Sequence, residues 1–308
     1  MLAYIIKRLT LAIPVFLGVS VIVFVIMVNT PGDPVLVRIG LDPNVSPEKV
    51  EAVRRELGLD QPIYVQYFRY LERLLQGDLG YNIRTGRPVA QDIAEAFPKT
   101  IILAVTSLLL AIVIGVTAGI ISAKKQYSKI DDVVSVVSLL AAAIPNFWLA
   151  LVLILVFSFW LKITPISGYG TPMHLILPTI ALGSALAGTI TRFTRSNLLE
   201  IIRQDFIRTA RAKGLKDRVV IIRHALKNAL IPIITVVGLQ FGTLLSGAFF
   251  VEAVFAYPGL GRLAVQAILQ KNYPVIQGAI LVVSISFVLI NLLIDIIYAY
   301  IDPRVQYE

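Results

Sequence analysis

The sequence contains no cysteine and only two histidines. Without cysteine there can be no disulfide bond, no thiol nucleophile and no thiolate metal site. The two histidines, His174 and His224, lie far apart in the sequence and do not indicate a metal-binding cluster. The dipeptide Gly-Lys is also missing. The phosphate-binding pattern G-x-x-x-x-G-K-[ST] is therefore absent, so the chain is not an ATPase by that route.

Charge is scarce because hydrophobic residues dominate the composition. They make up 57% of the 308 residues, charged residues make up 15%, and the mean hydropathy is +0.80. A soluble domain is usually about 25% charged, so these values predict a membrane protein. The net charge of +9 is compatible with a nucleic-acid partner, but basic residues of membrane proteins concentrate in cytoplasmic loops. We adopt the second interpretation and expect no nucleic acid.

Six stretches are free of formal charge and long enough to cross a bilayer, which takes about 20 apolar residues. The predicted fold class is therefore an all-α membrane protein with six transmembrane helices. The fourth stretch opens with turn-forming residues, so we expect its helix to begin near Met173. The third contains Pro145 and Asn146, which indicate either a tolerated kink or a bend that widens a pathway. The stretches are residues 9–28, 101–123, 133–161, 163–191, 228–251 and 273–294.

Basic residues lie mostly on one side of these spans. Lys7 and Arg8 precede the first span, three lysines follow the second, and ten Lys and Arg residues occupy residues 192–227. With six spans all three regions face the same side, which the distribution of positive charge identifies as the cytoplasm. Both termini are then cytoplasmic, including a tail at residues 302–308. The first span, within residues 1–30, is too long for a signal peptide, and no cleavage-site pattern follows it.

Residues 31–98 differ from the rest of the chain, with ten acidic and eight basic side chains. Ser46 is a candidate helix N-cap, Pro47 stands at a first helical position, and Gly58 is a stop signal. Two further short helices are expected, in QPIYVQYFRYLERLLQG and in RPVAQDIAEAF, the second ending before Pro98. We predict a small helical, extracytoplasmic module that rests on the spans, followed by a five-helix core at residues 99–301.

The basic segment between the fourth and fifth spans cannot lie inside the bilayer. One Lys or Arg at the membrane centre costs about 3 kcal/mol, so ten would cost on the order of 30 kcal/mol. Ile202, Phe206 and Ala210 share one helical face, Asp205 can cap a helix start, and Gly214 can end it. The resulting helix of about ten residues is about 15 Å long. Two interpretations stay open: a helix that docks in a groove of another protein, or an interfacial helix that touches lipid phosphates.

This segment contains DFIRTARAKGL followed by RHALKNALIPIITVVG. Both resemble the cytoplasmic loop of the permease subunits of peptide-type ABC importers. The whole chain resembles that family, and it is most similar to the first of the two permease subunits in dipeptide, oligopeptide, glutathione and nickel importers. Further matching segments, in the order that the family shows, are MLAYIIKRL, PGDP, LGLDQPIYVQYFRYL, GDLGYN with RPV, IPNFWLA, YPGLGRLAVQAI and NYPVIQG.

The resemblance implies a role for the basic segment. In the wider superfamily this loop carries an E-A-A pattern and a glycine, and it docks in a cleft of the ATPase subunit as a coupling helix. Counting back from Gly214, the Glu position is Arg208 and the two Ala positions are Thr209 and Ala210, while Lys227 stands where the wider pattern has proline. The small residues and Gly214 keep the docking role. The implied ATPase-coupling residues are Asp205, Phe206, Arg208, Thr209, Ala210, Arg211, Ala212, Lys213, Gly214 and Leu215.

The resemblance also implies an assembly. We expect a multi-pass permease subunit in a prokaryotic inner membrane, paired with a second homologous permease and two cytoplasmic ATPases. An extracytoplasmic binding protein would deliver a di- or oligopeptide to residues 31–98 and 252–272. ATP and Mg belong to the ATPases, so this chain is expected to be no enzyme and to need no cofactor or metal. The alternatives are the same machinery for nickel or glutathione and, more distantly, an ion-coupled carrier or a membrane scaffold.

Four polar residues are candidates for the transport pathway. In the resembled family the fifth span lines the pathway, which implicates Gln240 and Thr243. A Gln between helices serves equally well as interhelical hydrogen-bonding glue. Asn146 follows the proline of the third span. Glu252 begins the outer segment EAVFAYPGLGRL, where it either contributes to an outer gate or faces water.

Overall fold

The computed structural model describes residues 2–29, 35, 46–56 and 58–301. Every regular element within these residues is a helix, and the strand-like pairing there is limited to an isolated bridge between Tyr81 and Pro88. The elements in chain order are α1 (Leu2–Asn29), α3 (Pro47–Glu56), α4 (Ile63–Leu75), α5 (Val89–Lys124), α6 (Lys129–Ala143), α7 (Asn146–Leu153), the π-helix η1 (Ile154–Trp160), α8 (Met173–Ile202), α9 (Asp205–Ala212), α10 (Asp217–Val219), the π-helix η2 (Val220–Ala225), α11 (Leu226–Val254), α12 (Leu260–Leu269) and α13 (Tyr273–Ile301).

Each of the six predicted spans falls on one helix or on one bent pair of helices. By length and composition, α5, α8 and the Tyr273–Leu293 part of α13 can each cross a membrane alone. Two bent pairs pass the same test when each counts as one span: α6 with α7 and η1, and Asp217–Leu230 with Pro232–Gly242. With α1 they make up an all-helical, multi-span membrane protein. The helix of the fourth span begins at Met173, as predicted.

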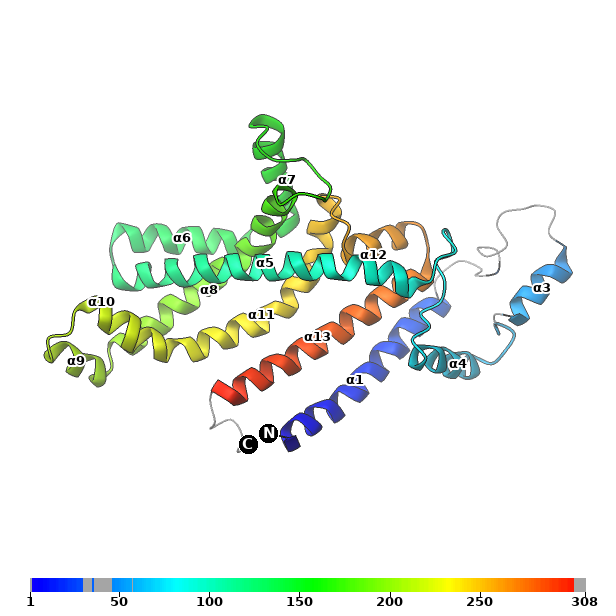
Figure 1. Ribbon diagram of the computed structural model, residues 1–308, viewed down its shortest axis with the longest axis horizontal. Coiled ribbons are helices and arrows are strands. Elements are labelled where there is room, and N and C mark those ends of the chain that lie inside the picture. Colours follow the sequence, from blue (N-terminus) through cyan, green and yellow to red (C-terminus); the bar gives the residue numbers. More distant parts are fainter. Residues whose placement is uncertain (1, 30–34, 36–45, 57, 302–308) are drawn as a thin grey trace.

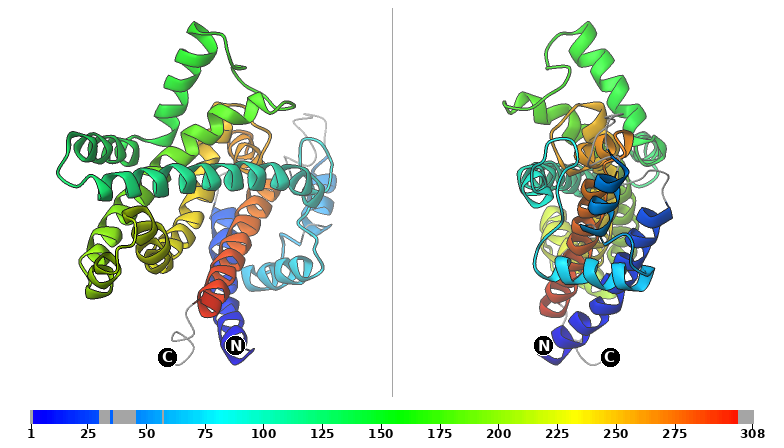
Figure 2. Two further views of the ribbon diagram at one scale, coloured as in Figure 1. Left: turned by 60° about the vertical axis from the view of Figure 1, so that its left-hand side comes forward. Right: turned by 90° about the vertical axis from the view of Figure 1, so that its right-hand side faces the viewer.

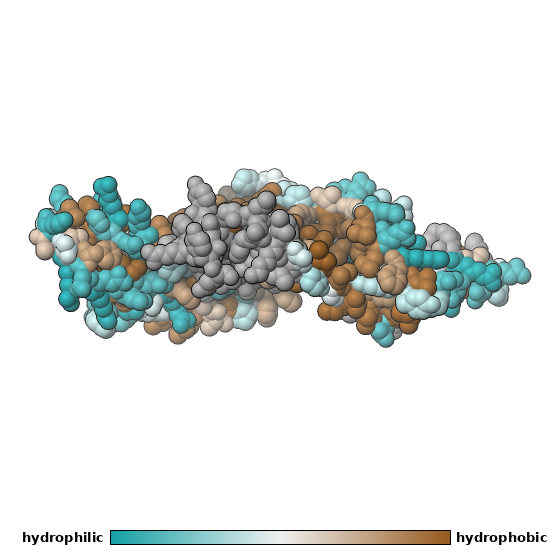
Figure 3. Space-filling view, turned by 90° about the horizontal axis from the view of Figure 1, so that it is seen from below, coloured by the Kyte–Doolittle hydropathy of each residue, from teal (hydrophilic) through white to brown (hydrophobic). Residues whose placement is uncertain are grey.

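The long helices give the molecule a long axis (Figure 1 and Figure 2). α5 extends along much of that axis, with α9 and α10 at one end and α4 and α12 toward the other. Seen from below, hydrophilic residues gather at both ends and hydrophobic residues lie between them (Figure 3). Large apolar side chains are also exposed along the middle of α5, for example Leu109 and Val113. This distribution is that of a protein whose long axis crosses a bilayer.

α5 and α8 pack closely because two glycines of α5 face α8. A Cβ atom on Gly115 would lie 2.7 Å from Cβ of Ile190, and one on Gly119 would lie 2.5 Å from Cβ of Thr194. Glycines four residues apart on one helix face allow two membrane helices to approach closely. The main core surrounds this contact and includes Leu103, Ala104, Ala111, Leu182, Leu186 and Ile190.

The start of α5 differs from the prediction. The short helix expected to end before Pro98 instead continues through the proline into the second span, giving one helix of 36 residues. Proline removes a backbone donor and usually kinks or ends a helix. Here Val89 and Ile93 are buried in a cluster with Leu260 of α12 and Val275 of α13. This packing holds the first turns of α5 in line with the rest.

The third span is not a single kinked helix. α6 ends at Ala143 and α7 begins at Asn146, and the two helices are bent by 104°. Ile144 is extended, with ψ 126°, as expected for a residue before proline, and Pro145 has φ −60° and ψ 133°. The chain thus breaks sharply at Pro145, and whether this bend widens a pathway stays a prediction. α7 turns away from the other long helices at this break (Figure 1).

Of the short helices that follow α1, α4 packs on it. Oγ of Ser20 and the Tyr67 hydroxyl are 2.9 Å apart. The Phe24 ring lies 5.3 Å from the Tyr67 ring and 5.8 Å from the Tyr70 ring. α3 begins with Pro47, and Gly58, just past its end, has φ +67°, as predicted for a stop signal.

Candidate coupling helix and substrate cavities

α9 is a helix of eight residues, and it follows α8 at the end of the molecule where basic residues are most numerous. Ile207 (0% exposed) and Ala210 (7% exposed) pack in a cluster with Leu198 of α8 and Val220 of η2. Gly214, two residues past the helix, has φ +75°, the left-handed conformation that ends many helices. α9 is therefore held by its own chain along one face only.

The other face of α9 is presented to solvent. Of the ten predicted coupling residues, Ala210 alone is buried and the other nine are exposed. Phe206 and Leu215 are each 40% exposed although they are apolar. An ion pair of 3.3 Å between Arg211 and Asp217 links the end of α9 to α10. The segment thus combines free charge, small residues and exposed apolar surface.

Two details of α9 correct the prediction. Its N-cap is Gln204, and Asp205 is the first helical residue. Its buried face carries Ile207, whereas Phe206 points outward. The predicted face assumed one continuous helix from Ile202, but α8 ends there and the turn before α9 resets the helical phase.

The basic segment as a whole is more helical than predicted. α8 continues to Ile202 and η2 begins at Val220, so residues 203–219 alone connect the long helices. Arg192 and Arg195, expected in a loop, are residues of α8. The free-energy cost of partly burying the Arg195 guanidinium is offset because this side chain pairs with a carboxylate.

That partner is Asp131, in the first turn of α6. Nε and Nη2 of Arg195 each donate to a different carboxylate oxygen of Asp131 at 2.7 Å. Asp131 also accepts from the Ser122 hydroxyl at 2.5 Å and from the Tyr127 amide at 3.0 Å. This network ties the turn between α5 and α6 to α8, which carries the cluster that holds α9.

The structure brings two predicted pathway residues together. Asn146 and Gln240 line one cavity of about 200 Å³, with Leu182, Thr189 and Leu244 among its other walls. The cavity lies beside the break between α6 and α7, because Asn146 is the first residue of α7. An amide side chain both donates and accepts hydrogen bonds. The cavity therefore offers two amides on otherwise mostly apolar walls.

A larger hollow of about 750 Å³ adjoins this cavity, since Thr189 lines both. It lies between α6 and α8, and its walls include Arg192 and Ser196. Neither hollow is lined by a carboxylate in the part of the chain that the structure describes. Together the two hollows form a path along α8 toward α9, which we call the polar lane. Thr243, the other candidate in α11, has a side chain outside the described residues.

Glu252 lies apart from this lane and does not face water. Its side chain is 0% exposed, and its carboxylate accepts from the Thr100 hydroxyl at 2.6 Å and from the amides of Gly261 and Arg262 at 2.7 and 3.2 Å. The water-facing alternative is therefore wrong. Burial raises the pKa of the neighbouring Tyr257 to about 12, so its phenol stays neutral. Glu252 fastens the outer segment after α11 to the outer part of α5.

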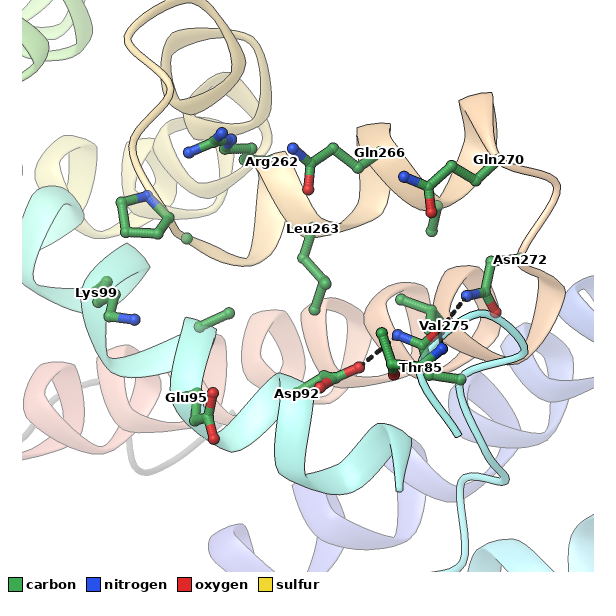
Figure 4. A pocket seen from close by; sticks show the side chains of 15 residues that line it. Thr85, Asp92, Glu95, Lys99, Arg262, Leu263, Gln266, Gln270, Asn272 and Val275 are labelled. Atoms are coloured by element: carbon green, nitrogen blue, oxygen red, sulfur yellow. Dashed lines mark hydrogen bonds between the residues drawn. The ribbon is translucent and has the colours of Figure 1, made fainter. Parts of the chain in front are cut away.

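The outer end also holds a polar cleft of about 360 Å³, between the first turns of α5, the α12 helix and the loop after α4 (Figure 4). Two nearly buried asparagines close one side of it: Nδ2 of Asn272 donates to Oδ1 of Asn82, and Nδ2 of Asn82 donates to Asp92, both at 2.7 Å. Lys99 and Arg262 also line the cleft.

Membrane-spanning helices, the polar lane along α8, and a short helix at the basic end, α9, that its own chain holds along one face are together typical of a membrane permease subunit. Two family models cover nearly the whole chain. The binding-protein-dependent transport system inner membrane component matches residues 115–307, and the N-terminal membrane component of such systems matches residues 1–104. The chain belongs to the family of binding-protein-dependent transport system inner membrane components.

Curated relatives match over the full length of both chains. The glutathione transport system permease protein GsiC of Escherichia coli (strain K12) is 43% identical over 308 residues, and the oligopeptide transport system permease protein AppB of Bacillus subtilis (strain 168) is 42% identical over 318 residues. A solved inward-facing structure of the MetNI methionine ABC transporter has a TM-score of 0.61 at 20% identity, covering 69% of this chain and 97% of that chain. The resemblance to peptide-type permeases is thus confirmed, and the fold is that of an ABC importer permease.

Sequence reasoning missed the Asp131–Arg195 pair and the outer cleft. The pair had a signal, because an aspartate in the first turn of a span needs a partner when it is buried. The cleft had none: Asn82 and Asn272, which bond each other, are 190 residues apart. A pattern of neighbouring residues cannot indicate such a contact.

Proposed function

We propose that this chain is the transmembrane permease subunit of an ATP-driven importer that carries di- or oligopeptides, or the peptide glutathione, into the cell. One observation carries the proposal. α9 is fixed to its own chain by Ile207 and Ala210 and presents the rest of its surface to a partner. The full-length relatives named as glutathione and oligopeptide permeases supply the substrate class.

The proposed partners follow from the same surfaces. Two cytoplasmic ATPases dock beneath this permease and a second homologous permease, one of them taking α9. ATP and Mg are bound by the ATPases, and both termini of this chain face the cytoplasm. An extracytoplasmic binding protein delivers the peptide to the end that carries α3, α4 and α12.

The coupling route runs through the cluster beneath α9. Ile207 packs with Leu198 and Val220, which belong to the elements that continue into α8 and α11. Both of these helices line the cavity that holds Gln240. A displacement of α9 by a closing ATPase pair therefore reaches the cavity walls through packed side chains, which transmit movement because protein interiors are dense.

The proposed pathway is the polar lane along α8. Asn146 and Gln240 offer donors and acceptors that match those of a peptide bond. Thr243 of α11 remains a candidate pathway residue. Glu252 does not line the lane; its buried carboxylate holds the outer segment after α11, which we take as the outer gate, against α5. The lack of a carboxylate on the described walls of the lane favours a peptide over a bare nickel cation.

Substitution of Ala212 by Trp tests the docking of α9. Ala212 is exposed and does not belong to the buried cluster, so the bulk should leave the fold intact. Gly214 is less suitable, because its positive φ makes any side chain there strained. Overpacking costs about 1–3 kcal/mol, so we expect Ala212→Trp to reduce co-purification of the ATPases about tenfold or more and to abolish ATP-driven uptake.

The matched control is Ala52→Trp, on an exposed face of α3 at the other end of the molecule. It should retain the ATPases. An ion-coupled carrier or a scaffold would purify without ATPases in every variant. Normal ATPase retention and uptake in Ala212→Trp would show that α9 is not the docking element.

A further inference from the structure

Of the four charged side chains that line the outer cleft, the two acidic ones form ion pairs and the two basic ones do not within the described residues. Asp92 and Glu95 line it, but each also pairs with Arg87, at 3.5 and 2.5 Å. Lys99 and Arg262 line it as well, and in the described part of the chain no carboxylate oxygen lies within 4.0 Å of the cationic group of either side chain. One guanidinium therefore serves two acids, whereas the cationic groups of Lys99 and Arg262 have no ion-pair partner among the described residues.

The two unpaired cations are held in place by uncharged groups. Nζ of Lys99 lies 5.6 Å from the centre of the Tyr169 ring, and Nη1 of Arg262 donates to the carbonyl of Ala256. Figure 4 shows Lys99 and Arg262 toward one end of the cleft and Gln270 toward the other. An aromatic ring and a carbonyl group therefore hold the two cationic groups in position, and neither group has a carboxylate partner among the described residues.

The rest of the lining suits a short peptide. Gln266 and Gln270 of the α12 end are exposed along the cleft, and amides hydrogen-bond peptide groups. Leu263 points into the cleft between the two helices (Figure 4) and offers an apolar contact. The volume of about 360 Å³ falls in the range of about 300–1,000 Å³ typical of small-ligand pockets, and it is too small for a folded partner.

We propose that this cleft binds the carboxylate end of a short peptide at the outer mouth of the permease. Lys99 and Arg262 bind the carboxylate, and the glutamine amides bind the peptide groups that precede it. Charge-assisted hydrogen bonds of this kind are about twice as strong as neutral ones. The cleft thus acts as a receiving site before the peptide enters the lane. This inference rests on the proposed function, because it takes a peptide as the substrate.

The test measures peptide binding to the complete membrane complex in nanodiscs, without the binding protein, by calorimetry. The probes are the tripeptide Ala-Ala-Ala and the same tripeptide with an amidated C-terminus. We expect the wild type to prefer the free carboxylate, and the double variant Lys99→Gln with Arg262→Gln to bind Ala-Ala-Ala about tenfold more weakly and to lose that preference. Since Arg262 also bonds Ala256, Lys99→Gln alone and Lys99→Arg are measured too; the first should weaken binding and the second restore it.

The control is Arg84→Gln, which removes one positive charge from the neighbouring loop outside the cleft and should change neither affinity nor preference. An unchanged preference in Lys99→Gln and in the double variant would overturn the proposal, as would a wild-type complex that binds neither probe. In both cases retained ATPase subunits and ATP-driven uptake would leave the proposed function standing. A wild-type complex without ATPases would instead count against the proposed function.

Discussion

At the scale of single residues, the outer segment is organised by one buried carboxylate. Glu252 of α11 has three donors within 3.2 Å: the Thr100 hydroxyl of α5 and the amides of Gly261 and Arg262 in the first turn of α12. The Thr100 hydroxyl has a double role, since it donates to Glu252 and accepts from the amide of Leu260 at 2.7 Å. Removing it would leave a buried charge and a buried amide each short of a partner.

Substitution of Thr100 by Val should therefore destabilise the outer segment. A hydrogen bond to a charged group contributes about 1.5–3 kcal/mol, and a buried donor left without a partner adds to the loss. We expect a lower Tm of the purified complex and faster proteolysis between α11 and α12. The control is Thr117→Val on the same helix, whose side chain is exposed. Equal shifts in the two variants would contradict the role of the Glu252 network.

At the scale of elements, the wall of the proposed pathway depends on how closely α5 and α8 approach. Gly115 and Gly119 leave no space for a side chain, because Ile190 and Thr194 of α8 lie against their backbone. α8 also presents residues to the lane, among them Thr189. A shift of α8 away from α5 would therefore change the shape of the lane as well as the stability of the core.

Substitution of Gly119 by Ala should separate these helices. The new Cβ would lie 2.5 Å from Cβ of Thr194 and 2.8 Å from the Thr191 carbonyl oxygen. Overpacking of this kind costs about 1–3 kcal/mol, so both the Tm and the uptake rate should fall. Gly18→Ala in α1 is the matched control, since nothing lies within 4 Å of its new Cβ. A normal Tm for Gly119→Ala would mean that the two helices pack differently in the membrane.

At the scale of the whole molecule, the two polar ends must face opposite sides of the membrane. The turn between α5 and α6 lies at the same end as α9, and the loop that contains Arg84 lies near α12 (Figure 1). From the excess of basic residues we expect the α9 end to face the cytoplasm. Docking of ATPases at α9 and delivery of peptide near α12 both require this orientation.

The absence of native cysteine makes this orientation directly measurable. Lys125→Cys and Arg84→Cys each place one thiol at an exposed position, at the cytoplasmic and outer ends respectively. A membrane-impermeant maleimide should label Arg84→Cys on intact cells, and Lys125→Cys after permeabilisation alone. Labelling of Lys125→Cys from outside would reverse the topology and exclude ATPase docking at α9.

Most of the architecture could be predicted from local patterns. The start of α8 at Met173 and the end of α9 before Gly214 follow from turn and cap chemistry acting over a few residues. The failures have two causes. Pro98 continues a helix because packing against α12 and α13 outweighs the local preference of proline. Ile207 rather than Phe206 is buried because the turn after α8 resets the helical phase.

The sequence by itself determined that this chain crosses a membrane and where along the chain its basic segment lies. Those properties depend on composition and on spacing along one helix, which the order of residues fixes. Only the tertiary structure decided that Asn146 meets Gln240 at one cavity, that Glu252 is buried beneath the outer segment, and that Lys99 and Arg262 line one cleft without an ion pair among the described residues. These are contacts between distant segments, and they exist only once the helices have packed.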